Sequence, residues 1–242
     1  MRSMIGSFAA LLLAGSLAGL PLAAAKHIMI PNTSFNSQSD FDADWNYLYP
    51  WGTDHNGGAR MAKSQPVSGE KPATHGGQQI PIHYLSGAVH AKEHFNVLRG
   101  GGYDFSGEFR APTARGTWPA FWLTAVQGWP PEIDMAEWKG NGKISFNTFN
   151  TSSQVRAKDV AYPDPGDFHT ILCQVRDENG RDVSAKLYMD GKLVDTQYGK
   201  GFVGAPMYLI INLQMEGASG SPGPSGDTLY QVQNLEVWSY NP

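Results

Sequence analysis

The sequence predicts an all-β fold, a sandwich of antiparallel sheets, and three observations support this. Short apolar or β-branched runs alternate along the chain with turn clusters rich in Gly, Pro, Asn and Asp. No long stretch has the periodicity of an amphipathic helix, and there is no internal repeat. Asp190-Gly191 separates the runs AKLYM and KLVDT. Because Asp-Gly readily adopts the positive φ angles of a type I′ turn, this dipeptide predicts a β-hairpin.

The N-terminal segment is predicted to be a secretory signal peptide. Met1-Arg2 is a short basic start, Ile5 to Leu22 is almost wholly apolar, and Ala23-Ala24-Ala25 supplies the small residues of a cleavage site. No later segment approaches the ~20 apolar residues needed to cross a bilayer. We therefore expect residues 1–25 to be removed and residues 26–242 to form a single secreted domain, extracellular or in the cell wall, that is monomeric and free of the membrane.

The remaining chain is divided into predicted strands and loops. Two stretches rich in glycine, proline and polar residues, Pro50 to Pro81 and Ala218 to Asp227, are predicted to be loops. Ten runs have the length and composition of strands. In chain order these are Ala88 to Ala91, Tyr103 to Ala111, Thr117 to Thr124, Glu132 to Trp138, Lys143 to Phe149, Phe168 to Arg176, Val183 to Met189, Lys192 to Thr196, Met207 to Met215 and Tyr230 to Tyr240.

Charge and composition narrow the range of functions that the sequence allows. The 18 basic residues, against 22 acidic ones, are scattered, so the chain lacks the basic patch of a nucleic-acid-binding protein. Cys173 is the single cysteine, which excludes an intramolecular disulfide. Asn32-Thr33-Ser34 and Asn150-Thr151-Ser152 fit the acceptor pattern for N-glycosylation. Aromatic residues form 12% of the chain and include seven tryptophans, whose flat rings suit either a β core or the binding of sugar rings.

The segment WPPEIDMAEW places Glu132, Asp134 and Glu137 within six residues. In a helix, Glu132 and Glu137 would lie about 140° apart and could not share a site. In a regular strand, Glu132 and Asp134 share one face while Glu137 falls on the other. A β-bulge at Met135-Ala136 would insert one extra residue, so that Glu137 returns to the face of Glu132 and Asp134. We therefore predict a bulged strand with all three carboxylates on one face.

Three carboxylates on one concave face repel one another, so one of them is expected to stay protonated at neutral pH. A protonated acid beside an ionised carboxylate is what glycoside hydrolysis requires. A calcium site is the alternative, although the flanking tryptophans and the lack of an Asn- or Asp-rich loop disfavour it. We expect the reaction to need no cofactor or metal ion, with a structural calcium ion left open.

The motifs GTWPAFWLT and WPPEIDMAEW closely resemble glycoside hydrolase family 16, whose signature is E-x-D-x-x-E or E-x-D-x-E. The resemblance continues through SGAVHAK, SGEFR, FHTILCQV, KLYMDGKLVDT and PMYLIINLQMEG, and covers most of the chain after Ser86. It implies a β-jelly-roll sandwich of two curved antiparallel sheets with a substrate cleft on the concave face. It also implies that Glu132 is the nucleophile, that Glu137 is the general acid and then base, and that Asp134 tunes their protonation.

The resemblance and the aromatic content also suggest substrate contacts, for each of which core packing or loop support is the alternative. HNGGARM resembles the Asn-Gly segment of the lichenase branch, and ISFNTFN and INLQ offer further polar side chains. The candidates are Asn56, His90, Trp118, Trp122, Trp129, Trp138, Asn147, Phe149, Asn212 and Gln214.

Four departures from laminarinase-like members of the family concern the substrate. Pro131 replaces a glycine before the first glutamate, and Asn147-Thr148 stands where a histidine is common. Val175 replaces a tryptophan, and His90 stands where some relatives have arginine. We expect a retaining endo-β-glycanase that cleaves β-1,3- or β-1,3/1,4-glucan. A β-galactan hydrolase (β-1,3-galactanase or agarase-like) is the alternative, and a transglycosylase or a non-catalytic carbohydrate-binding protein are further alternatives.

Overall fold

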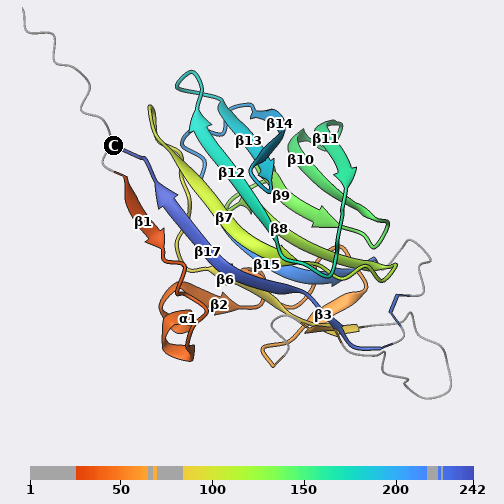
Figure 1. Ribbon diagram of the computed structural model, residues 1–242. Coiled ribbons are helices and arrows are strands. Elements are labelled where there is room, and N and C mark those ends of the chain that lie inside the picture. Colours follow the sequence, from red (N-terminus) through yellow and green to blue (C-terminus); the bar gives the residue numbers. More distant parts are fainter. Residues whose placement is uncertain (1–25, 65–67, 70–83, 217–222, 225) are drawn as a thin grey trace, which may run out of the picture.

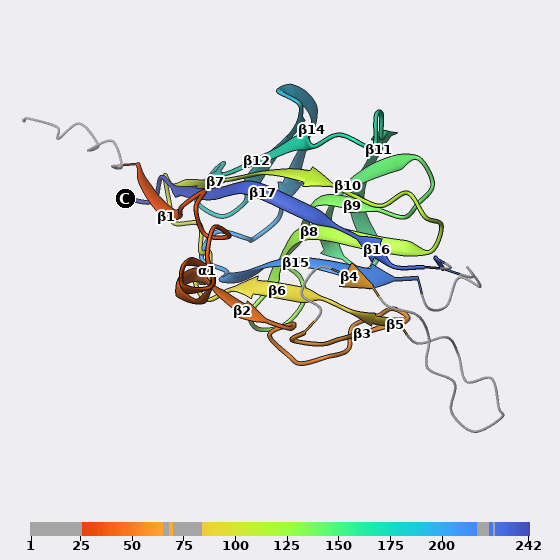
Figure 2. The same ribbon diagram turned by 60° about the horizontal axis from the view of Figure 1, so that its bottom comes forward.

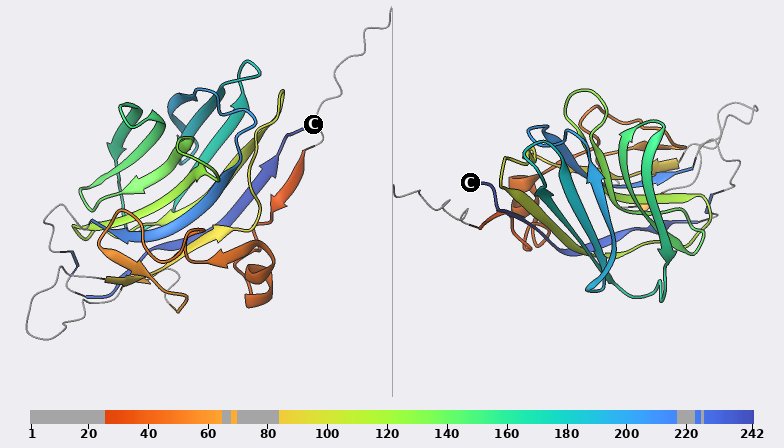
Figure 3. Two further views of the ribbon diagram at one scale, coloured as in Figure 1. Left: turned by 180° about the vertical axis from the view of Figure 1, so that it is seen from behind. Right: turned by 90° about the horizontal axis from the view of Figure 1, so that it is seen from above.

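A computed structural model describes residues 26–64, 68–69, 84–216, 223–224 and 226–242. The predicted signal peptide and parts of the two predicted loops lie outside these residues. In the described part, β-strands form two large sheets that stack on each other and curve together (Figure 1, Figure 3). The all-β prediction is confirmed.

The described elements are seventeen strands and one short helix. In chain order these are β1 (His27–Ile30), α1 (Gln38–Asp44), β2 (Trp45–Tyr47), β3 (Ala59–Met61), β4 (Ser68–Gly69), β5 (Tyr84–Ser86), β6 (Ala88–Ala91), β7 (Gly102–Arg110), β8 (Thr117–Ala125), β9 (Glu132–Trp138), β10 (Lys143–Thr151), β11 (Gln154–Ala161), β12 (His169–Asp177), β13 (Val183–Met189), β14 (Lys192–Gly199), β15 (Met207–Met215), β16 (Thr228–Leu229) and β17 (Gln231–Ser239).

The two large sheets are antiparallel throughout and form a jelly-roll sandwich. One has six strands in the order β1-β17-β7-β12-β13-β14, and the other has seven in the order β11-β10-β9-β8-β15-β6-β2. In Figure 2, β7, β12 and β17 lie above β8, β15 and β6. Neighbours within a sheet are often distant in sequence, so the strand order depends on long-range pairing. Small two-stranded sheets, β16-β4 and β3-β5, flank the sandwich.

All ten predicted strands form, with ends that differ by at most three residues from the predicted bounds. Strand β11 was not predicted, because most of its residues are polar and exposed, so no apolar run marks it. Helix α1 was missed as well, since it spans only 7 residues. Its start follows the usual rule: the Ser37 side chain caps it by accepting a hydrogen bond from the Asp40 backbone N–H.

The turn between β13 and β14 confirms the predicted hairpin. Asp190 and Gly191 have φ angles of 48° and 73°, so both central residues are in the left-handed region that a type I′ turn requires. The adjoining strands pair in register from Met189 with Lys192.

The core lies between the two sheets. In β7, burial alternates along the strand, so that Phe105 and Phe109 enter the core while Ser106 and Glu108 do not. Burying a phenylalanine side chain stabilises a fold by about 1.5–3 kcal/mol. Cys173 is buried in the same core as a free thiol. The fold is therefore stabilised by core packing and not by a disulfide.

Neither a membrane span nor a clustered metal site is found among the residues that the structure describes. No described helix is long and apolar enough to cross a bilayer. The same residues contain no group of three or more His, Cys, Asp or Glu side chains arranged to hold a metal ion.

Candidate active site

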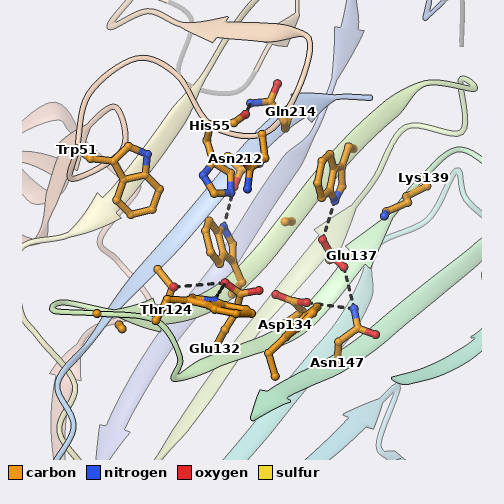
Figure 4. A pocket seen from close by; sticks show the side chains of 18 residues that line it. Trp51, His55, Thr124, Glu132, Asp134, Glu137, Lys139, Asn147, Asn212 and Gln214 are labelled. Atoms are coloured by element: carbon orange, nitrogen blue, oxygen red, sulfur yellow. Dashed lines mark hydrogen bonds between the residues drawn. The ribbon is translucent and has the colours of Figure 1, made fainter. Parts of the chain in front are cut away.

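A cleft of about 740 Å³ crosses the concave face of the seven-stranded sheet, the face turned away from the core. Its floor is formed by side chains of β8, β9, β10 and β15, and loop residues close its rim (Figure 4). Eleven predicted site residues line it: Asn56, Trp118, Trp122, Trp129, Glu132, Asp134, Glu137, Asn147, Phe149, Asn212 and Gln214.

The predicted bulge in β9 brings the three carboxylates to one face. Opposite β10, Asp134 pairs with Asn147 and Glu137 pairs with Ser145, so Met135 and Ala136 together face a single residue of β10. The pairing with β8 shifts at the same place. The extra residue restores the parity that a regular strand would lose. As a result, Glu132, Asp134 and Glu137 all point into the cleft (Figure 4).

Glu132 is held through one of its oxygens. Oε2 accepts hydrogen bonds from the Trp129 indole at 2.9 Å and from the Thr124 hydroxyl at 3.3 Å. Burial raises the pKa of Glu132 to about 7; the charge of Glu137 also raises it, while the two hydrogen bonds act in the opposite direction. Both donors bind Oε2, and no side chain or backbone group of the described residues forms a hydrogen bond to Oε1.

Asp134 and Glu137 share a donor, Asn147. The Asn147 Nδ2 lies 3.1 Å from Asp134 Oδ2 and 2.8 Å from Glu137 Oε2, and the Trp118 indole donates to Glu137 Oε1 at 2.6 Å. Burial raises the pKa of Asp134 well above its usual value, and the charges of Glu137 and Glu132 raise it further. Burial therefore favours the protonated form of Asp134, and its hydrogen bond to Glu137 acts in the same direction.

Further along the cleft, two amide side chains anchor its walls. Asn212 Oδ1 accepts a hydrogen bond from the Trp122 indole at 2.7 Å, which fixes that ring in the floor. Gln214 accepts from the Ala59 backbone N–H at 2.8 Å and donates to the His55 carbonyl at 2.7 Å. Gln214 thereby attaches the loop that carries Asn56 to β15.

Of the two predicted substrate contacts that do not line the cleft, Trp138 is wrong and His90 stays a prediction. Trp138 is 1% exposed and packs in the core against Phe109, Tyr162 and Tyr230, because the residue after Glu137 must point to the opposite face of β9. His90 does not line the cleft. It lies on β6, which is separated from β8 by β15, and its Nδ1 is 2.8 Å from the Leu48 carbonyl oxygen.

Four cleft residues with side chains suited to ligand contact were not predicted: Trp51, His55, Thr124 and Lys139. Trp51 and His55 lie in a loop without strand periodicity. His55 is the first residue of HNGGARM and Trp51 lies four residues before it, so this motif was the signal that could have found them. Lys139 follows the acidic motif, and its ammonium group lies 4.6 Å from the centroid of the Trp118 ring, a cation–π contact. It is the one lysine or arginine among the described residues that line the cleft.

The predicted glycosylation triplets differ in their surroundings. Asn32 is exposed, whereas the Asn150 side chain donates to the Tyr198 carbonyl at 3.0 Å and accepts from the Lys200 backbone N–H at 2.6 Å. In the fold, Asn150 therefore connects the end of β10 to β14.

Taken together, the cleft combines a proton donor and an ionisable carboxylate with aromatic walls. Trp51 and Trp129 are each 46% exposed, so they present ring faces to a ligand. Burial and the neighbouring carboxylates favour a bound proton on Asp134 and raise the pKa of Glu132 to about 7. This arrangement can protonate the leaving oxygen of a bound sugar on one side while a carboxylate attacks the anomeric carbon from the other side.

Comparisons with known proteins agree with this chemistry. The model of the family "Glycosyl hydrolases family 16" matches residues 94–208. A galactan endo-beta-1,3-galactanase of Flammulina velutipes is 53% identical over 224 residues, covering 86% of this chain and 89% of that protein. The endo-1,3-1,4-beta-glycanase ExsH of Rhizobium meliloti (strain 1021) is 30% identical over 48% of this chain and 25% of that protein. The crystal structure of an endo-1,3-beta-glucanase from Streptomyces sioyaensis has the same fold, with a TM-score of 0.64, 20% identity, and coverage of 83% of this chain and 91% of that one.

Proposed function

Because the chain belongs to glycoside hydrolase family 16, we propose that this endo-glycanase hydrolyses β-1,3-galactan and retains the configuration of the cleaved bond. The observation that carries the choice of substrate is the 53% identity to a galactan endo-beta-1,3-galactanase along 86% of the chain. This identity supports galactan as the substrate and reverses the order of the two expectations from the sequence motifs. Glucan is the second candidate. Part of this chain is similar in sequence to the glycanase ExsH, and its fold is similar to that of an endo-1,3-beta-glucanase.

In the first step, Glu132 attacks the anomeric carbon of the bound sugar while the bond to the leaving oxygen breaks. Glu137 gives its proton to that oxygen, and a covalent glycosyl ester on Glu132 results. Support comes from the contacts of Glu132: Trp129 and Thr124 hold Oε2, which orients the carboxylate for attack through its other oxygen.

In the second step, water enters from the side of Glu137. Glu137 takes a proton from the water as the oxygen attacks the anomeric carbon, and the ester bond to Glu132 breaks. Asp134 supports both steps, since the hydrogen bond it shares with Glu137 gives a route for the proton to reach the general acid. The cycle returns both glutamates to their starting protonation states.

The roles of the two glutamates are tested by Glu132→Ala and Glu137→Ala with azide, on an aryl glycoside of a β-1,3-linked galactooligosaccharide. Each folded variant should lose at least about 10²-fold in kcat on the polysaccharide. Azide should give an α-glycosyl azide with Glu132→Ala, because it enters from the side that Glu132 has vacated. With Glu137→Ala it should give the β-azide through the covalent intermediate. Parent-like turnover of the polysaccharide by either variant would refute the assignment.

The substrate is tested by release of reducing ends from β-1,3-galactan, laminarin, mixed-linkage glucan and agarose. We expect β-1,3-galactan to be cleaved with the highest kcat/KM. Faster cleavage of laminarin would make glucan the substrate. Retention of galactan without new reducing ends would instead indicate a binding protein, and longer products in the presence of an acceptor sugar would indicate transglycosylation.

A further inference from the structure

We infer that Asn147 is a positioning residue for the general acid: its side-chain amide donates to both Asp134 and Glu137 and holds the two carboxyl groups in place for proton transfer. The inference rests on the proposed function, because it assigns Asn147 to the acid–base pair of that reaction. It differs from the role that the sequence suggested for Asn147, which was contact with the substrate.

The position of Asn147 follows from the register of two strands. Asn147 on β10 lies directly opposite Asp134 on β9, and the bulge that follows Asp134 turns Glu137 toward the same amide. The amide nitrogen has two hydrogens, and it lies 3.1 Å from Asp134 Oδ2 and 2.8 Å from Glu137 Oε2. Each hydrogen therefore has a carboxylate as its acceptor, and none is left for a sugar hydroxyl.

Burial makes this contact strong. Asn147 is 8% exposed, Asp134 is 4% exposed and Glu137 is 9% exposed, so water competes little for these hydrogen bonds. Figure 4 shows the Asn147 amide beside the carboxyl groups of Asp134 and Glu137. The Trp118 indole donates to the other oxygen of Glu137. Glu137 is thus fixed at both oxygens, which orients a group that must deliver its proton to one atom of the substrate.

The amide also affects protonation. Burial and the charges of Glu137 and Glu132 raise the pKa of Asp134, whereas the hydrogen bond from Asn147 lowers it. An amide does not titrate, so it donates equally at every pH. Losing this donor would disfavour the ionised form of the pair, and the pair would keep its proton to higher pH.

The test compares Asn147→Asp and Asn147→Ala with Ser145→Ala as the matched control. Asn147→Asp keeps the size of the side chain but replaces the donor by a carboxylate. Ser145 lies two residues earlier on the same strand, opposite Glu137, but its hydroxyl bonds to Asp159 at 2.7 Å. The readouts are the pH profile of kcat/KM on β-1,3-galactan, and the titration of Asp and Glu carboxyl signals by ¹³C NMR, which does not depend on turnover.

We expect both Asn147 variants to lose about ten- to a hundredfold in kcat with little change in KM. The alkaline limb of their kcat/KM profile should move to higher pH, and the Asp134 carboxyl signal should titrate at higher pH. Ser145→Ala should match the parent in all three respects. If the melting curve shows that one Asn147 variant does not fold, the pH profile and the NMR titration of the other variant still test the positioning role of Asn147.

An unmoved alkaline limb, or a loss confined to KM, would overturn the inference and return Asn147 to a structural or substrate-contact role. Glu137→Gln separates this failure from failure of the proposed function. If Glu137→Gln abolishes turnover while the Asn147 variants keep the parent pH profile, only the positioning role falls. If Glu137→Gln keeps parent turnover, there is no acid–base pair to position, and both fall.

Discussion

Replacing Trp129 by phenylalanine should reduce activity mainly on the acidic side of the pH profile. The indole N–H of Trp129 donates to Glu132 Oε2 at 2.9 Å, and this hydrogen bond favours the ionised form of the nucleophile. Phenylalanine keeps a ring next to Phe149, whose centroid lies 5.7 Å from that of Trp129, but it has no N–H to donate. The pKa of Glu132, about 7 in the parent, should therefore rise.

The size of the effect follows from the exposure of the donor. A hydrogen bond to a charged group contributes about 1.5–3 kcal/mol when it is buried. Trp129 is 46% exposed, so water replaces part of the lost interaction and about 1 kcal/mol remains. This corresponds to an approximately fivefold smaller ionised fraction of Glu132 below pH 7. Well above pH 7 both proteins have Glu132 ionised, so this loss disappears.

The assay measures kcat/KM on β-1,3-galactan from pH 5 to pH 9 and plots the ratio of variant to parent. Trp51→Phe is the matched control, because Trp51 is equally exposed in the same cleft but its indole donates to the Asp54 carbonyl instead of a carboxylate. Loss of a sugar-stacking surface would lower the ratio equally at every pH in both variants. A ratio for Trp129→Phe that does not fall toward low pH would show that the indole N–H does not favour the ionised form of Glu132.

Two further predictions concern stability. Gln214→Ala should lower Tm by about 5–10 °C, because buried partners of Gln214, including the Ala59 N–H and the His55 carbonyl, would be left unpaired; a fall no larger than that of the exposed control Gln233→Ala would contradict this. Asp190→Asn should lower Tm more at pH 5.5 than at pH 9. Burial lowers the pKa of His169, but hydrogen bonds to Asp190 and to the Asp164 carbonyl raise it overall. The stabilisation is therefore complete below pH ~6.5 and is lost as pH rises through the raised pKa, and equal losses at the two pH values would contradict this.

Local patterns were sufficient for most of the fold. The strand runs and the Asp190-Gly191 turn were predicted because they depend on side-chain alternation and on backbone angles that few residues adopt. Elements without a hydrophobic signal, such as β11, were missed. Their stability comes from pairing with a neighbouring strand, which local sequence does not report.

The same alternation that predicted the bulge also explains one wrong prediction. Once Met135-Ala136 places Glu137 in the cleft, the next residue, Trp138, must face the core. Parity along β9 was therefore enough to exclude Trp138 as a sugar platform. His90 is different, because its distance from the carboxylates depends on the order of strands in the sheet.

The all-β class, the three carboxylates and the bulge that gives them one face could be predicted from local sequence, because each depends on residues adjacent in the chain. The side chains that surround those carboxylates could not be predicted in this way. Two of these side chains come from neighbouring strands, Asn147 from β10 and Trp118 from β8. Trp51 reaches the cleft from the loop that precedes Asn56. Their places depend on register and sheet order, and these are fixed by packing between segments that are far apart in sequence.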